Sequence, residues 1–225
     1  MRSKAFWIEQ LGEEWPDVLK SVLKTEEFDN AISALQFDYV FSKMYPRDKE
    51  DIFKLFKLCS WNNLKVVIIG TEPSTLAGTG GLAFSDQYSE EKNPSLETIR
   101  QCLSKQQEDL KIDFDYTLEH WASQGVLLLN RSLVCKQGEK NTHKDKWKKF
   151  FGTILFQIVL ERPGTIFFLW GSQAQRYSEV LSLNQYVFSW EHPMKACLEK
   201  RPWECPNFEQ ANQILKRNGG TGIIW

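Results

Sequence analysis

The fold is constrained most by Val66–Ile69, a run of β-branched apolar residues that ends at a glycine and, soon after, a proline. A continuous run of this kind is typical of a strand buried on both faces of a parallel sheet. Similar runs follow at residues 126–129, 166–170 and 186–190, with helical patterns between them. Strands that alternate with helices predict an α/β fold with a central four-stranded parallel sheet flanked by helices.

Apolar residues at helical spacing predict the helices of this fold. They mark an N-terminal helix within residues 7–34, an apolar stripe over 52–58, and helices at 96–108, 118–123, 147–160, 174–181 and 208–217. A chain of 225 residues is long enough to bury one large core. We therefore expect a single domain over residues 1–225.

Composition excludes some classes of protein and leaves others open. The net charge of −1 does not indicate a nucleic-acid partner for the chain as a whole. The five cysteines form neither a CxxC pair nor a zinc-ligand spacing, as is typical of reduced thiols inside cells. Residues 1–10 lack the apolar centre of a signal peptide, and no run is long enough to cross a membrane. We expect a cytoplasmic monomer (nuclear if eukaryotic) that binds no metal and no membrane.

Polar residues follow each of the four strand-like runs. Glu72 comes after the first run, Asn130 after the second, Ser172 after the third and His192 after the fourth. Because the carboxyl ends of parallel strands meet at one edge of a sheet, these residues are expected to converge. A carboxylate can orient a water, an imidazole can donate to a departing anion, and an amide can read the edge of a base. With Phe84 as a stacking face, the set suits hydrolysis of a bond whose leaving group becomes anionic.

Seven short motifs carry these residues in a fixed order. They are GTEPST at 70–75, GLAFS at 81–85, PSLE at 94–97, GVLLLN at 125–130, NTHK at 141–144, LWGSQAQ at 169–175 and HP at 192–193. In order and spacing together they resemble the family 1 uracil-DNA glycosylases, over essentially the whole chain. The resemblance implies a three-layer α/β sandwich and hydrolysis of the N-glycosidic bond of a flipped-out base in DNA, to leave an abasic site.

The resemblance also implies a role for each matching residue. Glu72 stands where the family has the aspartate that positions the attacking water, and His192 where it stabilises the anion developing at the base oxygen. Phe84 stands where a ring stacks on the base, and Asn130 where an amide reads its edge. Two serines, Ser95 and Ser172, match residues that contact backbone phosphates. No metal and no organic cofactor is implied.

Three departures from the family pattern affect the expected activity. Thr71 replaces a glutamine beside the base, and Glu72 is one methylene longer than aspartate, a displacement of about 1.5 Å that can cost about 10²-fold in rate. Ser74 replaces the tyrosine that excludes thymine by packing against C5 of uracil, which predicts a wider pocket.

The segment after His192 departs as well. It lacks two phosphate-binding serines and has Ala196 where the family has a leucine wedge. Lys195 is then the candidate phosphate contact, and Met194 or Leu198 the candidate wedge.

The densest basic stretch lies between the second and third strands. Six lysines within residues 136–149 flank His143. Such a run is usually a solvated face, but its place after Asn130 puts it beside the expected site, where it would neutralise phosphates. Lys144 is therefore predicted to contact the DNA backbone, and His143 either to contact a phosphate there or to be structural, but not to be a catalyst.

Two functions remain open from the sequence. The first is a DNA glycosylase for uracil or a C5-modified pyrimidine, since Asn130 keeps the base-reading amide and Ser74 widens the C5 side. The second is a DNA-binding or regulatory relative that has lost efficient catalysis, since the carboxylate and the serines are altered. The presence of Phe84, Asn130, His192 and a carboxylate in one chain favours the enzyme.

Overall fold

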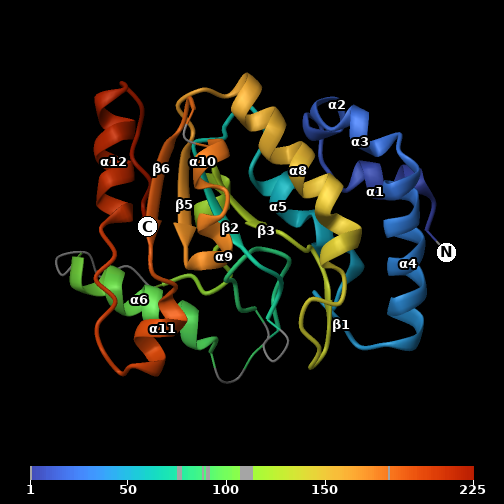
Figure 1. Ribbon diagram of the computed structural model, residues 1–225, viewed down its shortest axis with the longest axis horizontal. Coiled ribbons are helices and arrows are strands. Elements are labelled where there is room, and N and C mark those ends of the chain that lie inside the picture. The colour runs from blue at the N-terminus through green and yellow to red at the C-terminus, as the bar shows by residue number, and fades with distance from the viewer. Residues whose placement is uncertain (1, 75–77, 88, 90–91, 107–113, 182) are drawn as a thin grey trace.

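A computed structural model describes residues 2–74, 78–87, 89, 92–106, 114–181 and 183–225. Its centre is a four-stranded sheet in the order β3-β2-β5-β6 (Figure 1). The strands are β2 (Val66–Gly70), β3 (Val126–Asn130), β5 (Ile166–Trp170) and β6 (Tyr186–Trp190). All three pairings are parallel, so the four carboxyl ends lie at the same edge of the sheet. The predicted fold class and all four predicted strands are confirmed.

Helices cover both faces of the sheet. In Figure 1, α12 lies on one side of the strands and α8 and α5 on the other, while α6 and α11 lie near the edge toward which β5 points. The bounds are α5 (Lys54–Leu58), α6 (Pro94–Gln106), α7 (Glu119–Ser123), α8 (Lys144–Glu161), α11 (Pro193–Leu198) and α12 (Asn207–Arg217). The helix predicted over 96–108 runs past α6 into residues outside the described ones. Among the described residues, no helix is long and apolar enough to span a membrane.

The single helix predicted within residues 7–34 is wrong. Four helices stand there: α1 (Lys4–Glu9), α2 (Trp15–Val18), α3 (Lys20–Leu23) and α4 (Glu26–Phe41). Gly12 has a φ of +79°, which breaks the helical path after α1. Thr25 begins α4 by accepting the backbone N–H of Phe28 on its side-chain oxygen, a cap that separates α4 from α3.

Other short elements were missed or merged in the prediction. The helix expected at 174–181 is two helices, α9 (Ser172–Gln175) and α10 (Ser178–Leu181). A 3₁₀ helix, η1 (Lys49–Phe53), precedes α5, and β1 (Met44–Tyr45) pairs antiparallel with β4 (Cys135–Lys136). The helix α11, directly after His192, was also not predicted. It begins where the His192 side chain accepts the N–H of Met194.

Aromatic side chains fill the core on both sides of the sheet. Toward α12, the Trp170 ring packs on Phe208, with ring centroids 5.7 Å apart, and Trp225 packs on Phe208 at 5.0 Å. Toward α8, Phe53 packs against Trp147 at 5.9 Å. Aromatic pairs of this geometry contribute about 1 kcal/mol each beyond the area they bury. This rigid core fixes the strand ends that carry the predicted site.

Candidate functional site

A cavity of about 460 Å³ lies at the carboxyl edge of the sheet. Glu72, Asn130 and His192, which come from three different strand ends, all line it. Thr71, Ser74, Phe84 and Ser95 complete the set of predicted residues in its wall. Three of the four strand-end residues therefore converge, over a span of 120 positions in the sequence, whereas Ser172 does not line this cavity. Thr75, the last residue of the first motif, lies outside the described residues.

The amide of Asn130 is held at the floor of the cavity. Its side chain is only 4% exposed, at the last position of β3, directly opposite Gly70 of β2. A β-carbon on Gly70 would collide with the Oδ1 atom of Asn130. Glycine at the end of β2 thus leaves the space that the Asn130 amide occupies.

Phe84 forms one wall of the cavity. Its φ of +69° is unusual for a bulky residue and marks a backbone held by its surroundings. The ring lies edge-on to Trp170, with centroids 5.3 Å apart, and tilted against the imidazole of His192 at 5.7 Å. Phe84 is therefore fixed between the core and the catalytic candidate, with one part of its ring in the cavity.

The imidazole of His192 has a defined proton position. The backbone N–H of Met194 donates to its Nδ1 atom at 3.2 Å, so the proton of the neutral ring is on Nε2. Burial lowers the pKa of His192, which keeps the ring neutral near pH 7. Gly171, with a φ of +81°, lies so close that a β-carbon there would approach Cβ of His192 to 2.8 Å. The site thus presents a neutral N–H donor.

The carboxylate of Glu72 is held by a residue far along the chain. The backbone N–H of Asn141 donates to Oε2 of Glu72 at 2.7 Å. Burial raises the pKa of Glu72, while the Asn141 N–H and the charges of Lys140 and Arg131 act in the opposite direction. The group is therefore a more basic carboxylate than an exposed glutamate, as a proton acceptor for water requires.

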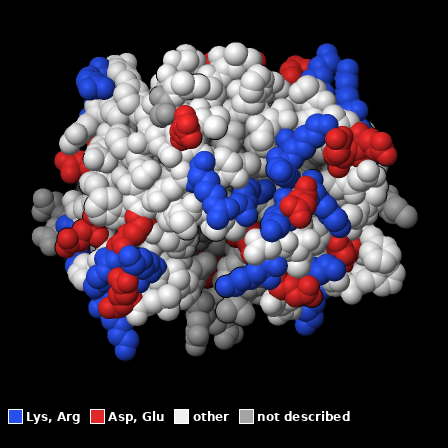
Figure 2. Space-filling view, in the orientation of Figure 1, with Lys and Arg blue, Asp and Glu red and all other residues white. Residues whose placement is uncertain are grey.

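A second cavity, of about 840 Å³, adjoins the first and shares Thr71 and Glu72 with it. Five cationic residues line this second cavity: Arg131, Lys140, Lys144, Lys148 and Arg176. Glu72 and Asp145 line it too, so positive side chains outnumber negative ones in its wall. Figure 2 shows Lys and Arg side chains gathered around a hollow on this face of the molecule. The arrangement attracts anions to the side of the predicted site.

The residues predicted to contact the DNA backbone lie at different places in the structure. Lys144 is exposed in the second cavity, and Ser172 and Lys195 are exposed at the starts of α9 and α11, while Ser95 is buried in the wall of the first cavity. For His143 the predicted phosphate contact is wrong, and the structural alternative is the one that holds. Its side chain is 2% exposed and hydrogen-bonded to Asp38, so it cannot reach a phosphate at the surface.

Solvent exposure distinguishes Met194 from Leu198, the two candidates for the side chain that would enter the duplex. Ala196, at the position of the family's leucine, is fully buried, whereas Leu198 is 75% exposed. Met194 lines the first cavity. Leu198 is thus the apolar side chain of α11 that is free to enter a partner.

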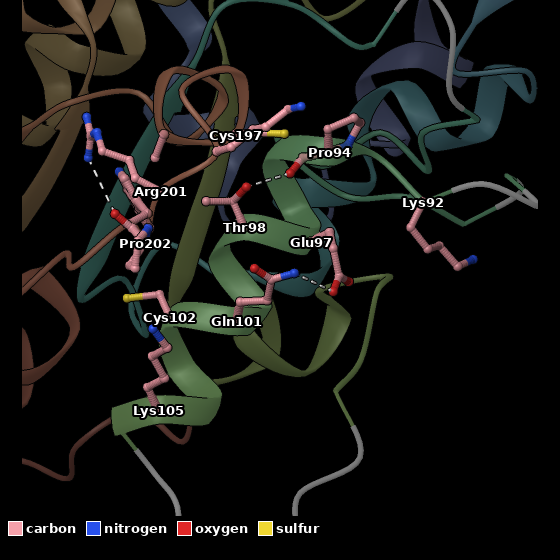
Figure 3. A pocket seen from close by; sticks show the side chains of 13 residues that line it. Lys92, Pro94, Glu97, Thr98, Gln101, Cys102, Lys105, Cys197, Arg201 and Pro202 are labelled. Carbon is pink, nitrogen blue, oxygen red and sulfur yellow. Dashed lines mark hydrogen bonds between the residues drawn. The ribbon is translucent and has the colours of Figure 1, made fainter.

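A third cavity, of about 570 Å³, lies between α6 and the chain that follows His192 (Figure 3). Cys102 and Lys105 of α6 face it from one side, and Cys197 and Arg201 from the other. None of the residues predicted for the site lines this cavity, although it shares Lys92 and Pro94 with the first.

Two residues that support the site were not identified from the sequence. Asn141 belongs to a recognised motif, but nothing in the motif shows that its backbone N–H holds Glu72. The thiol of Cys135 donates to the carbonyl oxygen of Pro73 at 3.2 Å, beside Glu72, although no cysteine was assigned to the site. Both contacts depend on the path of the backbone, for which the sequence carries no signal.

Comparison with known proteins gives the family. A family model described as the uracil DNA glycosylase superfamily matches residues 56–216. The chain is 32% identical to a uracil-DNA glycosylase of Chlamydia trachomatis serovar L2b over 228 residues, covering 99% of this chain and 98% of that protein. It is 32% identical to a uracil-DNA glycosylase of Fusobacterium nucleatum, covering 96% of each. In fold it is similar to the crystal structure of mimivirus uracil-DNA glycosylase, with a TM-score of 0.85 and 21% identity over 97% of this chain and 88% of that one. The chain belongs to the uracil-DNA glycosylase superfamily.

Proposed function

We propose that this protein removes a flipped-out pyrimidine from DNA, and that its cavity accepts pyrimidines with a C5 substituent as well as, or in place of, uracil. Its enzyme class follows from its family: it is a DNA glycosylase, which hydrolyses an N-glycosyl bond. The observation that carries the proposal is the single cavity lined by Glu72, Phe84, Asn130 and His192.

The geometry supports a hydrolytic step with separate roles at the two ends of the bond. The bond between C1′ and the base nitrogen breaks, and its electron pair goes to the base, where charge develops on an oxygen. The Nε2–H of His192 donates to that oxygen and stabilises the anion. Glu72 accepts a hydrogen bond from a water whose oxygen attacks C1′. The water supplies the hydroxyl of the abasic sugar, and its proton passes to the base.

Binding of the base would use the other walls of the cavity. The ring of Phe84 stacks on the base, and the amide of Asn130 offers a donor and an acceptor to its edge. Thr71 lies beside the base through its backbone. A base held in this way would place its glycosidic bond between Glu72 and His192.

We assign to Ser74 the selection between uracil and C5-substituted bases. It lines the cavity with a small side chain where the family has a tyrosine ring, which would otherwise occupy the space next to C5. A methyl group in or out of a fitted pocket is worth about 10- to 200-fold in discrimination. Loss of the ring therefore removes the barrier to thymine-like and larger C5-modified bases.

The DNA strand is proposed to follow the charged features outside the cavity. The cations of the second cavity, among them Lys144, would neutralise phosphates next to the flipped nucleotide. Ser95, Ser172 and Lys195 would contact further phosphates, and Leu198 would fill the place the base leaves in the duplex.

A panel of oligonucleotides tests this function. It carries uracil, thymine, 5-hydroxymethyluracil and 5-hydroxymethylcytosine, the last both plain and glucosylated, and abasic sites are counted after alkaline cleavage. We expect release of at least one C5-substituted base, and we expect Ser74→Tyr to lower that release while sparing uracil. If uracil alone is released and Ser74→Tyr changes nothing, the proposed specificity is wrong.

A DNA-binding or regulatory relative that has lost efficient catalysis is the second candidate, favoured by the lengthened carboxylate of Glu72 and by the missing phosphate-binding serines after His192. The same panel separates the two. Abasic sites formed equally by the wild type, Glu72→Gln and His192→Ala would identify background cleavage and a binder. Loss of the product in both variants would identify the enzyme.

A further inference from the structure

His143, which cannot reach DNA, is the centre of a buried chain of polar contacts. The backbone N–H of Lys136 donates to the hydroxyl of Thr142 at 3.2 Å, and that hydroxyl lies 2.9 Å from Nδ1 of His143. Nε2 of the same ring lies 2.8 Å from Oδ2 of Asp38. A carboxylate only accepts, so Nε2 carries the proton and Nδ1 accepts the proton of the Thr142 hydroxyl. Every donor in the chain therefore has an acceptor.

Asp38 ties three elements to this chain. It lies on α4, with its side chain 11% exposed, and is ion-paired with Lys136 of β4 at 3.2 Å. Lys146, in the first turn of α8, lies 3.9 Å from its Oδ2 atom. The carboxylate thus fixes both ends of the segment 135–143, which connects β4 to α8.

The segment 135–143 in turn holds the loop that carries the catalytic carboxylate. At one end the thiol of Cys135 donates to the carbonyl of Pro73 at 3.2 Å, and at the other the N–H of Asn141 donates to Glu72 at 2.7 Å. Asn141 has a φ of +60°, a left-handed conformation that asparagine adopts more readily than most residues. Its N–H reaches Glu72 only while that turn is kept.

We propose that Asp38 and His143 are positioning residues for Glu72, acting through the segment 135–143 and the backbone N–H of Asn141. This inference rests on the role of Glu72 in the proposed function. If Glu72 positions the attacking water, displacing its carboxylate by about 1 Å lowers the rate of base release by about 10²-fold. A buried pair placed only for stability would have no such effect on a folded protein.

The pKa of Glu72 provides a second test of the inference, independent of the reaction rate. Burial raises the pKa of Glu72, and the Asn141 N–H, Lys140 and Arg131 oppose that rise. The pKa of the Cys135 thiol is raised to about 12, first by burial and then by the charge of Glu72. Loss of the Asn141 hydrogen bond would leave burial less opposed, and the pKa of Glu72 would rise further.

The groups around His143 define which substitutions are informative. Burial lowers the pKa of His143 and the Asp38 carboxylate opposes this, while Lys146 and Lys136 lower it further. Thr142→Val keeps the side-chain shape and removes the hydroxyl, and with it both the link to His143 and the acceptor of the Lys136 N–H. His143→Ala removes both contacts of the ring, and His143→Gln restores a donor to Asp38.

A matched control is available between the same two helices. Glu27 of α4 pairs with Lys149 of α8 at 2.7 Å, at the surface and without contact to the segment 135–143. Glu27→Gln therefore breaks a contact between α4 and α8 that does not lead to Glu72.

The experiment measures the steady-state kcat and KM for an oligonucleotide that the wild type cleaves, each against pH, and single-turnover rates check that kcat reports base release. We expect kcat to fall about 10- to 100-fold in Thr142→Val and His143→Ala with KM within twofold, and to recover in His143→Gln. The acid limb of kcat is expected to move to higher pH in the two impaired variants and to stay in place in Glu27→Gln. Folded variants with unchanged kcat, or a loss in Glu27→Gln of the same size, would overturn the inference.

A readout without activity separates this inference from the proposed function. The pKa of the Glu72 carboxyl is followed by NMR titration of the free protein, in the wild type and in Thr142→Val. A higher pKa in Thr142→Val supports the positioning role even if no base is released by any variant. An unchanged pKa contradicts it, whatever the activity, and Thr142→Val carries this test if His143→Ala does not fold.

Discussion

The side chain of Asn130 occupies the space that a β-carbon on Gly70 would need. The two residues are paired across neighbouring parallel strands, at the last position of each. One strand therefore ends in the residue proposed to read the base, and the other ends in the only residue type small enough to sit beside it.

Gly70→Ala is expected to displace the Asn130 amide and to lower kcat/KM by about 10²-fold. The methyl group would also approach Cβ of Ala83 to 2.9 Å, so the strand end cannot simply tilt away. Steady-state kinetics on the preferred oligonucleotide measure the loss, and thermal unfolding shows whether the fold is kept. Full activity in a folded variant would mean that the Asn130 amide does not bind the base.

Glu72→Asp is expected to lower kcat, although aspartate is the residue of the wider family. Shortening the side chain by about 1.5 Å withdraws the carboxylate from the N–H of Asn141 and from the water, at a cost of about 10²-fold. Single-turnover rates for Glu72→Asp and Glu72→Gln are compared, because glutamine keeps the length and loses the charge. A faster Glu72→Asp variant would show that the longer side chain is a defect here.

The rate of base release is expected to fall on the acid side at a higher pH than for an exposed glutamate. Burial raises the pKa of Glu72, and the carboxylate must be ionised to accept a proton from water. Activity is therefore complete above that raised pKa and is lost as the pH falls through it. This fall of the rate at acid pH should be absent from the residual activity of Glu72→Gln. If it persists in that variant, the titrating group is His192 instead.

Lys144→Gln is expected to weaken DNA binding and to reduce its dependence on salt. Each phosphate contact removed lowers the slope of log affinity against log salt by about 0.7 to 0.9. Lys149→Gln is the control, because Lys149 lies on the same helix but pairs with Glu27 away from the second cavity. The slopes of log affinity against log salt are measured by fluorescence anisotropy on an abasic duplex. Equal slopes for the two variants would show that DNA does not pass the second cavity.

The four strands and the edge at which they converge could be predicted from the sequence. Strands buried on both faces are continuous apolar runs, and a glycine or a polar residue at each end marks where they stop. Glu72, Asn130 and His192 were identified in this way because each lies within three residues of the end of such a run. The N-terminal helices were not separated correctly, since their ends depend on a left-handed glycine, Gly12, and on the cap at Thr25.

The sequence by itself determined the α/β architecture, its strand ends and the kinds of side chain delivered there, because these depend on local periodicity and on the handedness of parallel connections. Tertiary structure decided which of those side chains are fixed by hydrogen bonds, and which residues make those bonds. Asn141 reaches Glu72 across 69 positions, and His143 reaches Asp38 across 105. Contacts of that separation depend on how finished elements pack, so a histidine in a lysine-rich stretch became a buried hydrogen-bond partner instead of a ligand for phosphate.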